Sequence, residues 1–252
     1  MDYSGTLQAR PPLTTYADVA KMIDHSLLRP ELTDRDIEEG CRIAREYQVM
    51  SVTVRPADIE LASRLVQGSG VKVGTVCGFP HGSTTTPVKL FEARDALRRG
   101  ATEIDMVLNI GKMISREFQY VEMEIHQMVK ACHDCGALLK VIFENSYLTE
   151  DLKVIACKIG NRCEVDFIKT STGFSGGGAT IEDLKLMRRH AMPDVSVKAA
   201  GGVRTLDKLI EVYEVGVSRI GATATVAILD EWKSRLAKAE AEKAAEIVPP
   251  VS

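Results

Sequence analysis

The chain has 252 residues, of which 45% are apolar and 27% are charged, as in an ordinary globular protein. Its 32 Lys and Arg residues against 35 Asp and Glu residues give a formal net charge of −3, which argues against a dedicated nucleic-acid-binding protein. No apolar run reaches the roughly 18 residues of a membrane-spanning helix, and the first 21 residues lack the apolar core of a signal peptide. We therefore expect a cytoplasmic protein that binds neither nucleic acid nor membranes and keeps its six sparse cysteines reduced.

Short β-branched runs alternate with longer amphipathic stretches, a pattern typical of βα units and a parallel sheet. Most of these runs are almost continuously apolar, as expected for strands that are buried on both faces. The expected strands are 22–28, 51–54, 71–76, 103–108, 138–143, 165–170, 195–200 and 218–223. Eight strands with intervening helices favour a closed barrel over an open, doubly wound sheet. The sequence therefore predicts an α/β protein formed by a single (β/α)₈ TIM barrel.

The two ends of the chain depart from this alternation. We expect residues 1–15 to be a loose leader and residues 16–240 to form the barrel with a C-terminal helix. The charged stretch after Trp232 predicts that final helix, because it stops before a Pro-Pro pair. Residues 241–252 are expected to be a flexible tail.

Among the ionisable residues in or at the ends of the apolar strand segments, where a buried charge is costly unless it is paired or neutralised, four are candidates for a chemical role. They are Asp24, Asp105, Lys169 and Lys198. Polar residues at the C-terminal ends of barrel strands are candidates for an active site. The structural alternative is that the two lysines only form internal ion pairs with Asp105 and Asp24.

Two lysines on neighbouring strands favour a chemical role. Adjacent strands lie about 4.8 Å apart, so the two side chains can approach each other inside a barrel. Two ammonium groups about 4 Å apart, at an effective dielectric constant of 20, repel by roughly 4 kcal/mol. That repulsion makes one lysine a competent amine nucleophile, and such a lysine forms a Schiff base with a carbonyl substrate.

Glycines after the last two strands point to a phosphate site. Gly201 and Gly202 directly follow the seventh expected strand, and Gly221 lies in the eighth. Barrels commonly bind phosphate at these two loops through backbone N–H groups. The alternative is that the glycines only permit tight turns.

Several motifs together resemble the deoxyribose-phosphate aldolases, a family of class I (Schiff-base) aldolases with a (β/α)₈ barrel. The resemblance runs from about Ile23 to Ile228 and is carried by IDHSLLRP, GFPHGSTTTPVK, EIDMVLNIG, FIKTSTGFSGGGAT, VKAAGGVRT and RIGAT. It implies reversible cleavage of 2-deoxy-D-ribose 5-phosphate to acetaldehyde and D-glyceraldehyde 3-phosphate. It also implies a small-molecule aldehyde and sugar-phosphate substrate, no metal and no organic cofactor.

The resemblance assigns roles to individual residues. Lys169 matches the Schiff-base lysine, Lys198 the second lysine that lowers its pKa and helps in proton transfer, and Asp105 the acid/base carboxylate. Substrate-binding residues implied in the same way are Asp24, Thr170, Gly173, Gly201, Gly202, Gly221 and Thr223.

The chain differs from many members after Gly221, where Thr223 and Ala224 replace a serine pair. A threonine hydroxyl still donates a hydrogen bond, whereas alanine has none to donate. The same aldol chemistry on a non-phosphorylated or different sugar or aldehyde therefore stays open. So do two other classes, a sugar-phosphate isomerase or epimerase with Asp105 as base, and a non-catalytic sugar-phosphate sensor.

Cys132 and Cys135 form a C-x-x-C motif, which raises the question of zinc or redox chemistry. A structural zinc site needs four ligands, and Cys157 and Cys163 do not form a second such pair. We therefore expect no metal site and interpret these thiols as structural. Exposed helix faces favour a homo-oligomer, a dimer or a tetramer.

Overall fold

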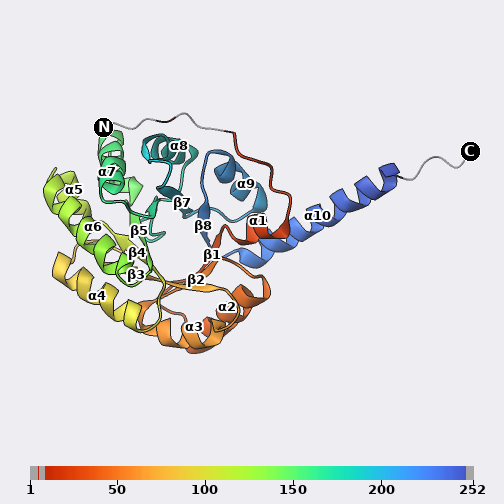
Figure 1. Cartoon of the computed structure of the whole chain (residues 1–252), viewed down its shortest axis with the longest axis horizontal. Coiled ribbons are helices and arrows are strands. Elements are labelled where there is room, and N and C mark those ends of the chain that lie inside the picture. The colour runs from red at the N-terminus through yellow and green to blue at the C-terminus, as the bar shows by residue number, and fades with distance from the viewer. Residues whose placement is uncertain (1–4, 6–8, 248–252) are drawn as a thin grey trace, which may run out of the picture.

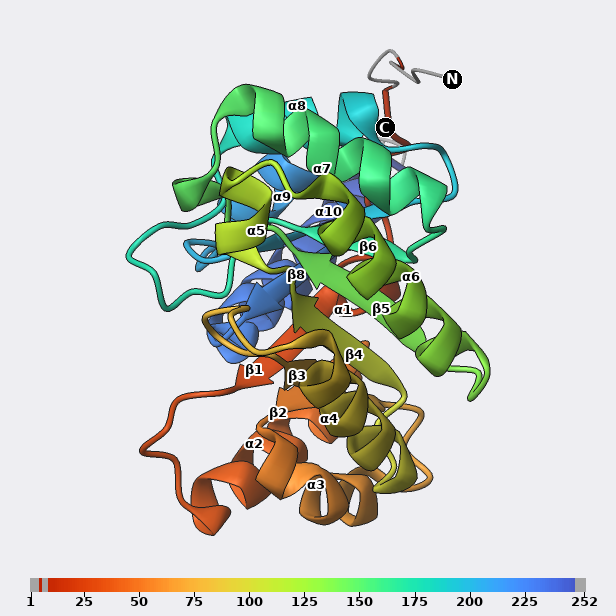
Figure 2. The ribbon, with the colours of Figure 1, turned by 90° about the vertical axis from the view of Figure 1, so that its left-hand side faces the viewer.

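The structure is a computed structural model that describes residue 5 and residues 9–247 of the chain. Eight parallel strands close into a barrel in the order in which they occur along the chain (Figures 1 and 2). They are β1 (Ile23–Leu27), β2 (Ser51–Val54), β3 (Lys72–Cys77), β4 (Glu103–Val107), β5 (Leu138–Ile142), β6 (Phe167–Lys169), β7 (Ser196–Ala200) and β8 (Arg219–Ala222). The prediction of a single (β/α)₈ barrel is confirmed. Each expected strand contains or closely overlaps an observed one.

Helices surround the barrel and cover the outward-facing apolar side chains of the strands. They are α1 (Tyr16–Ala20), α2 (Asp34–Glu46), α3 (Ile59–Val66), α4 (Thr86–Arg98), α5 (Ile110–Ile114), α6 (Phe118–His133), α7 (Glu150–Arg162), α8 (Ile181–His190), α9 (Leu206–Glu214) and α10 (Thr225–Ile247). Several begin at a threonine whose hydroxyl accepts a hydrogen bond from the first helical turn, as Thr33 does for α2 and Thr205 for α9. The apolar core lies between this helical layer and the strands.

The register of the strands places ionisable residues side by side. Lys169 of β6 pairs with Lys198 of β7, and Asp105 of β4 pairs with Lys140 of β5. Alternate residues of a strand point to the same face, so these side chains enter the barrel interior while their neighbours pack outward. The barrel interior around these residues is therefore filled largely by charged side chains.

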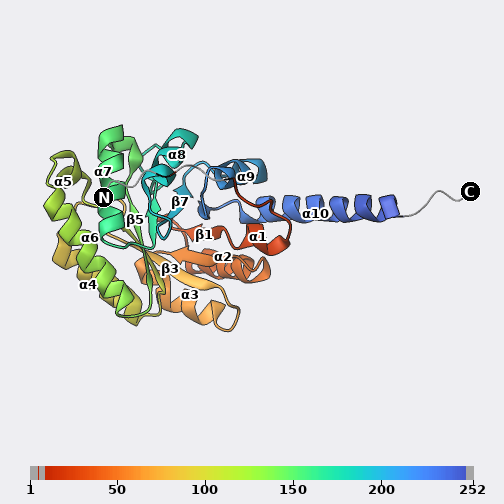
Figure 3. The same cartoon turned by 45° about the horizontal axis from the view of Figure 1, so that its top comes forward.

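The ends of the chain differ in part from the expected leader and tail. Arg10 donates a hydrogen bond to the Val217 carbonyl and stacks 3.9 Å from the Tyr213 ring centre, so this part of the expected leader contacts α9 and the turn after it. Helix α10 continues to Ile247 and extends away from the barrel (Figures 1 and 3), because its alanine-, lysine- and glutamate-rich sequence favours a helix beyond residue 240. The flexible tail expected from residue 241 is therefore helical through residue 247, whereas residues 1–4, 6–8 and 248–252 lie outside the described residues.

Within the described part of the chain, no helix is both long and apolar enough to cross a membrane.

Candidate active site

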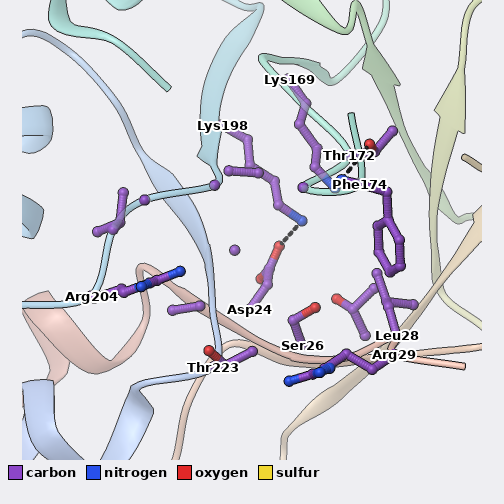
Figure 4. Close-up of a pocket in the computed structure, with 18 residues that line it drawn as sticks. Asp24, Ser26, Leu28, Arg29, Lys169, Thr172, Phe174, Lys198, Arg204 and Thr223 are labelled. Carbon is purple, nitrogen blue, oxygen red and sulfur yellow. Dashed lines mark hydrogen bonds and ion pairs between the residues drawn. The ribbon is translucent and has the colours of Figure 1, made fainter. Parts of the chain in front are cut away.

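Three side chains from three strands meet inside the barrel, near the C-terminal ends of those strands. Lys169 Nζ and Lys198 Nζ each lie 2.7 Å from the same oxygen, Asp105 Oδ2. Lys198 Nζ also lies 2.5 Å from Asp24 Oδ2 (Figure 4). The Lys198 ammonium therefore bridges two carboxylates. All four side chains are buried. The structure thus brings together the four ionisable residues that the sequence analysis singled out.

A second layer of charges lies on the other side of the two aspartates. Lys140 Nζ contacts Asp105 Oδ1 at 2.8 Å and Glu103 Oε2 at 2.6 Å. Arg219 contacts Asp24 Oδ1 and, at 2.8 Å, Glu103 Oε2. Glu103, Lys140 and Arg219 were not predicted as site residues, although each is a charged residue in an apolar strand and Glu103 lies two positions before Asp105, on the same strand face.

The buried network carries one more cation than it has carboxylates to pair with. Its four cations are Lys140, Lys169, Lys198 and Arg219, and its three carboxylates are Asp24, Glu103 and Asp105. Taking an unbalanced charge out of water is costly, so the network favours the loss of one proton. Lys169 has a single carboxylate contact in this network, whereas Lys140 and Lys198 each contact at least two.

Burial is the largest influence on the pKa of Lys169. It lowers this pKa to about 8, assisted by the charges of Lys198 and Lys140 and opposed by Asp105. Burial alone would raise the pKa of Asp105, but the three surrounding lysines hold it well below its usual range. At pH 7 about one Lys169 side chain in ten is then the neutral amine, against roughly one in three thousand for an ordinary lysine. Desolvation thus contributes more than the lysine–lysine repulsion on which the sequence argument relied.

A cavity of about 440 Å³ opens above these charges, at the C-terminal ends of the strands (Figure 4). The predicted residues that line it are Asp24, Lys169, Gly173, Lys198, Gly201, Gly202, Gly221 and Thr223. Asp105 is fully buried beneath it and reaches the cavity through its contacts with the lysines. Thr170 is placed elsewhere: its hydroxyl hydrogen-bonds the backbone of Ala200, because successive strand residues point to opposite faces.

The part of the cavity formed by the loops after β7 and β8 is suited to an anion. Gly201 and Gly202 have φ values of +80° and +90°, which glycine adopts without strain. The same loop carries Arg204, which lines the cavity, as does Arg29 after β1 (Figure 4). Neither arginine was predicted from the sequence. A guanidinium beside a glycine-rich turn is a common arrangement for binding phosphate.

His25 of β1 and His81, in the loop between β3 and α4, lie outside this cavity. His25 is buried, and its Nδ1 lies 2.7 Å from the Thr225 hydroxyl at the start of α10, consistent with packing against a helix. His81 lines a second cavity of about 220 Å³, which shares Thr172 and Phe174 with the first. Of the C-x-x-C pair, Cys132 is buried and Cys135 exposed. Among the described residues, no group of three or more His, Cys, Asp or Glu is arranged to hold a metal.

Comparisons with known proteins identify the family of the chain. Residues 18–234 match the family described as DeoC/LacD family aldolase. The chain is 50% identical over 212 residues to the deoxyribose-phosphate aldolase of Clostridium perfringens, covering 84% of this chain and 94% of the relative. It is 46% identical over 221 residues to the deoxyribose-phosphate aldolase of Rhodopirellula baltica, covering 88% and 92%.

A solved structure shares the fold at similar coverage. The tetrameric deoxyribose phosphate aldolase from Aeropyrum pernix has a TM-score of 0.81 and 31% identity, covering 88% of this chain and 93% of that one. The family match spans the whole barrel, from α1 into α10. The chain is therefore a member of the DeoC/LacD family of aldolases.

Proposed function

We propose that this aldolase reversibly cleaves 2-deoxy-D-ribose 5-phosphate to acetaldehyde and D-glyceraldehyde 3-phosphate, with Lys169 as the Schiff-base lysine. The observation that carries the proposal is a buried lysine with a pKa lowered to about 8 at the bottom of a cavity whose rim is cationic. The relatives named above support the choice of substrate.

In the proposed reaction, the neutral amine of Lys169 attacks C1 of the open-chain sugar, the C1 oxygen takes up protons and leaves as water, and one added proton remains on the product as the charge of an iminium ion. A base removes the proton of the C3 hydroxyl, the C2–C3 bond breaks, and its electrons neutralise the iminium as an enamine. D-Glyceraldehyde 3-phosphate departs. Protonation of the enamine carbon and addition of water then release acetaldehyde and restore the amine.

Asp105 and Lys198 are the proposed proton-transfer groups. Asp105 contacts both lysines through one oxygen, so a proton moving between the amines and the substrate stays within hydrogen-bond reach of a carboxylate. Asp24 Oδ2 is the second carboxylate oxygen that contacts Lys198 Nζ, besides Asp105 Oδ2. The proposed role of Asp24 is therefore to orient Lys198 and to shape the substrate site.

The phosphate is proposed to bind at Gly201, Gly202, Gly221 and Thr223, with Arg204 adding a positive charge. Gly173 is proposed to line the sugar side of the cavity, and Thr170, whose hydroxyl bonds the β7 backbone, to support the loop after Lys169. Ala224 supplies no hydroxyl, but Thr223 lines the cavity and supplies one. Preference for the phosphorylated sugar over deoxyribose itself is part of the proposal.

The test is reduction with borohydride during incubation with deoxyribose 5-phosphate and, separately, with deoxyribose. We expect an adduct on Lys169 that forms preferentially with the phosphorylated sugar. Equal trapping of both sugars would keep the aldolase chemistry and overturn the phosphate assignment. Absence of an adduct on any lysine of the folded protein would favour an isomerase, an epimerase or a sensor.

A homo-oligomeric, cytoplasmic enzyme completes the proposal. The A. pernix relative is described as tetrameric, and Phe91 of α4 and Met123 of α6 are 69% and 63% exposed on helices that pack against each other. Large exposed apolar side chains favour association. All six cysteines are free, as is usual in a reducing compartment. Sedimentation equilibrium would measure the assembly, and a monomer at micromolar concentration would contradict it.

A further inference from the structure

Glu144 occupies a constrained position beside the loop that follows the Schiff-base lysine. It comes two residues after the end of β5, has a left-handed backbone with φ of +53°, and is 1% exposed. The backbone on both sides of it is held to β6 and its exit: Phe143 N donates to the Lys169 carbonyl and Asn145 N to the Thr170 carbonyl, both at 2.9 Å. A non-glycine residue in the left-handed region is strained. Such a residue persists only where the surrounding structure fixes it, which is common at functional sites.

The Glu144 carboxylate is directed to one residue of that loop. Its Oε2 accepts hydrogen bonds from both the hydroxyl and the backbone N–H of Thr172, the latter at 3.2 Å. Its Oε1 is buried and has no hydrogen-bond partner among the described residues. The Thr172 hydroxyl also accepts a hydrogen bond from Phe174 N at 3.0 Å. Glu144 therefore acts on the loop through Thr172.

These contacts determine which kind of hydrogen bond Thr172 can offer to a ligand. A carboxylate only accepts hydrogen bonds, so the single hydroxyl proton of Thr172 is donated to Glu144. A hydroxyl oxygen has two acceptor sites, and Phe174 N occupies one of them. Thr172 lines the catalytic cavity, and the acceptor site that remains on its hydroxyl can serve a ligand only as a hydrogen-bond acceptor.

We infer that Glu144 is a positioning residue that fixes Thr172 as a hydrogen-bond acceptor and thereby selects aldehydes bearing a hydroxyl beside the carbonyl carbon. The inference rests on the proposed function. In the five-carbon substrate, C1 is bound by Lys169, the C3 hydroxyl loses its proton, and C5 carries the phosphate. The C4 hydroxyl is left, and it is the 2-hydroxyl of the glyceraldehyde phosphate. Thr172 lies on the Lys169 side of the cavity, across from Arg204 (Figure 4).

The test measures addition of acetaldehyde to two aldehydes, D-glyceraldehyde 3-phosphate and 3-phosphooxypropanal, which lacks the 2-hydroxyl. The readout is the ratio of their kcat/KM values in wild type, Glu144→Leu, Thr172→Val and Thr172→Ser. We expect wild type to prefer the hydroxylated aldehyde by roughly tenfold, the contribution of one well-formed hydrogen bond. The ratio should fall toward one in E144L and T172V and persist in T172S, which keeps the hydroxyl.

The double variant E144L/T172V separates positioning from general damage. If Glu144 acts through Thr172, the double variant should show the same ratio as T172V alone. If E144L slows both aldehydes equally and leaves the ratio unchanged, Glu144 is only structural and the inference is wrong. If E144L does not fold, the Thr172 variants decide, since a ratio in T172V equal to that of wild type would overturn the inference. Wild type that adds acetaldehyde to neither aldehyde would instead refute the proposed function.

Discussion

Replacing Lys198 by methionine tests how the buried network prepares Lys169 for attack. Each of the two Nζ atoms lies 2.7 Å from Asp105 Oδ2, so they are at most 5.4 Å apart. At an effective dielectric constant of about 20, two unit charges at that separation repel by roughly 3 kcal/mol. Without this repulsion the pKa of Lys169 rises, and the neutral amine at pH 7 becomes about 100-fold scarcer.

The charge balance of the network leads to the same expectation. With Lys198 absent, the three cations Lys140, Lys169 and Arg219 face three carboxylates. Protonated Lys169 is then no longer the surplus charge. The substitution should therefore affect the protonation of Lys169 even though the amine of Lys169 and its contact with Asp105 are retained.

The assay is the initial rate of borohydride trapping of acetaldehyde on Lys169, measured from pH 6 to pH 11. In wild type we expect the rate to reach half its maximum near pH 8. In K198M the midpoint should rise toward that of an ordinary lysine, and the rate at pH 7 should fall about 100-fold. Lys198→Arg keeps the charge and should keep the midpoint. A midpoint in K198M equal to that of wild type would refute a role for the Lys198 charge and leave burial and Lys140 as the causes.

Three further substitutions have outcomes that follow from the same structure. Lys169→Met removes the surplus buried cation, so K169M should be more stable than wild type by about 3 kcal/mol at pH 7 in urea unfolding. This difference in stability should disappear between pH 8 and 10.5, because in that range the folded lysine is already neutral while the unfolded one still binds a proton. Arg204→Met should raise KM for deoxyribose 5-phosphate about tenfold and leave KM for deoxyribose unchanged, and an equal rise for both sugars would place the phosphate elsewhere. Burial lowers the pKa of His25 to about 4, so the wild type should lose about 3 kcal/mol of stability as the pH falls from 6.5 to 4. His25→Asn should lack this loss. If the stabilities of the two proteins fell in parallel with pH, this expectation would be wrong.

The barrel was predictable because its signal is local. Each strand is a short apolar run between turn or helix signals, and the eight runs required no knowledge of their partners. The pairing of Lys169 with Lys198 was also within reach, since consecutive strands of a barrel are neighbours. The placement of Thr170 follows from strand alternation, which directs it away from the face of Lys169.

The rest of the network joins residues that lie far apart in the sequence. Arg219 meets Asp24 across 195 residues, and Lys140 meets Asp105 across 35. Which charged strand residues meet depends on register and on the closure of the barrel, neither of which can be read from composition or periodicity. That burial lowers the pKa of Lys169 more than repulsion by Lys198 does can likewise be recognised only from the positions of all its neighbours.

The contact between Glu144 and Thr172 could not be anticipated for a different reason. Glu144 follows an apolar strand in an ordinary-looking turn, and nothing in its local sequence marks a left-handed, buried carboxylate. Its partner lies 28 residues further along the chain, in the next βα loop. Function-bearing loops are held by such side-chain contacts, which sequence patterning does not encode.

The most direct test of the central claim is the mass of the peptide containing Lys169 after borohydride reduction in the presence of deoxyribose 5-phosphate. The proposed mechanism requires the protein to gain the mass of the reduced sugar or acetaldehyde adduct, with the modification on Lys169. The folded protein should lose that gain when Lys169 is replaced by methionine. An adduct mapped to Lys198 or Lys140, or none in folded and active enzyme, would contradict the assignment of Lys169 as the nucleophile.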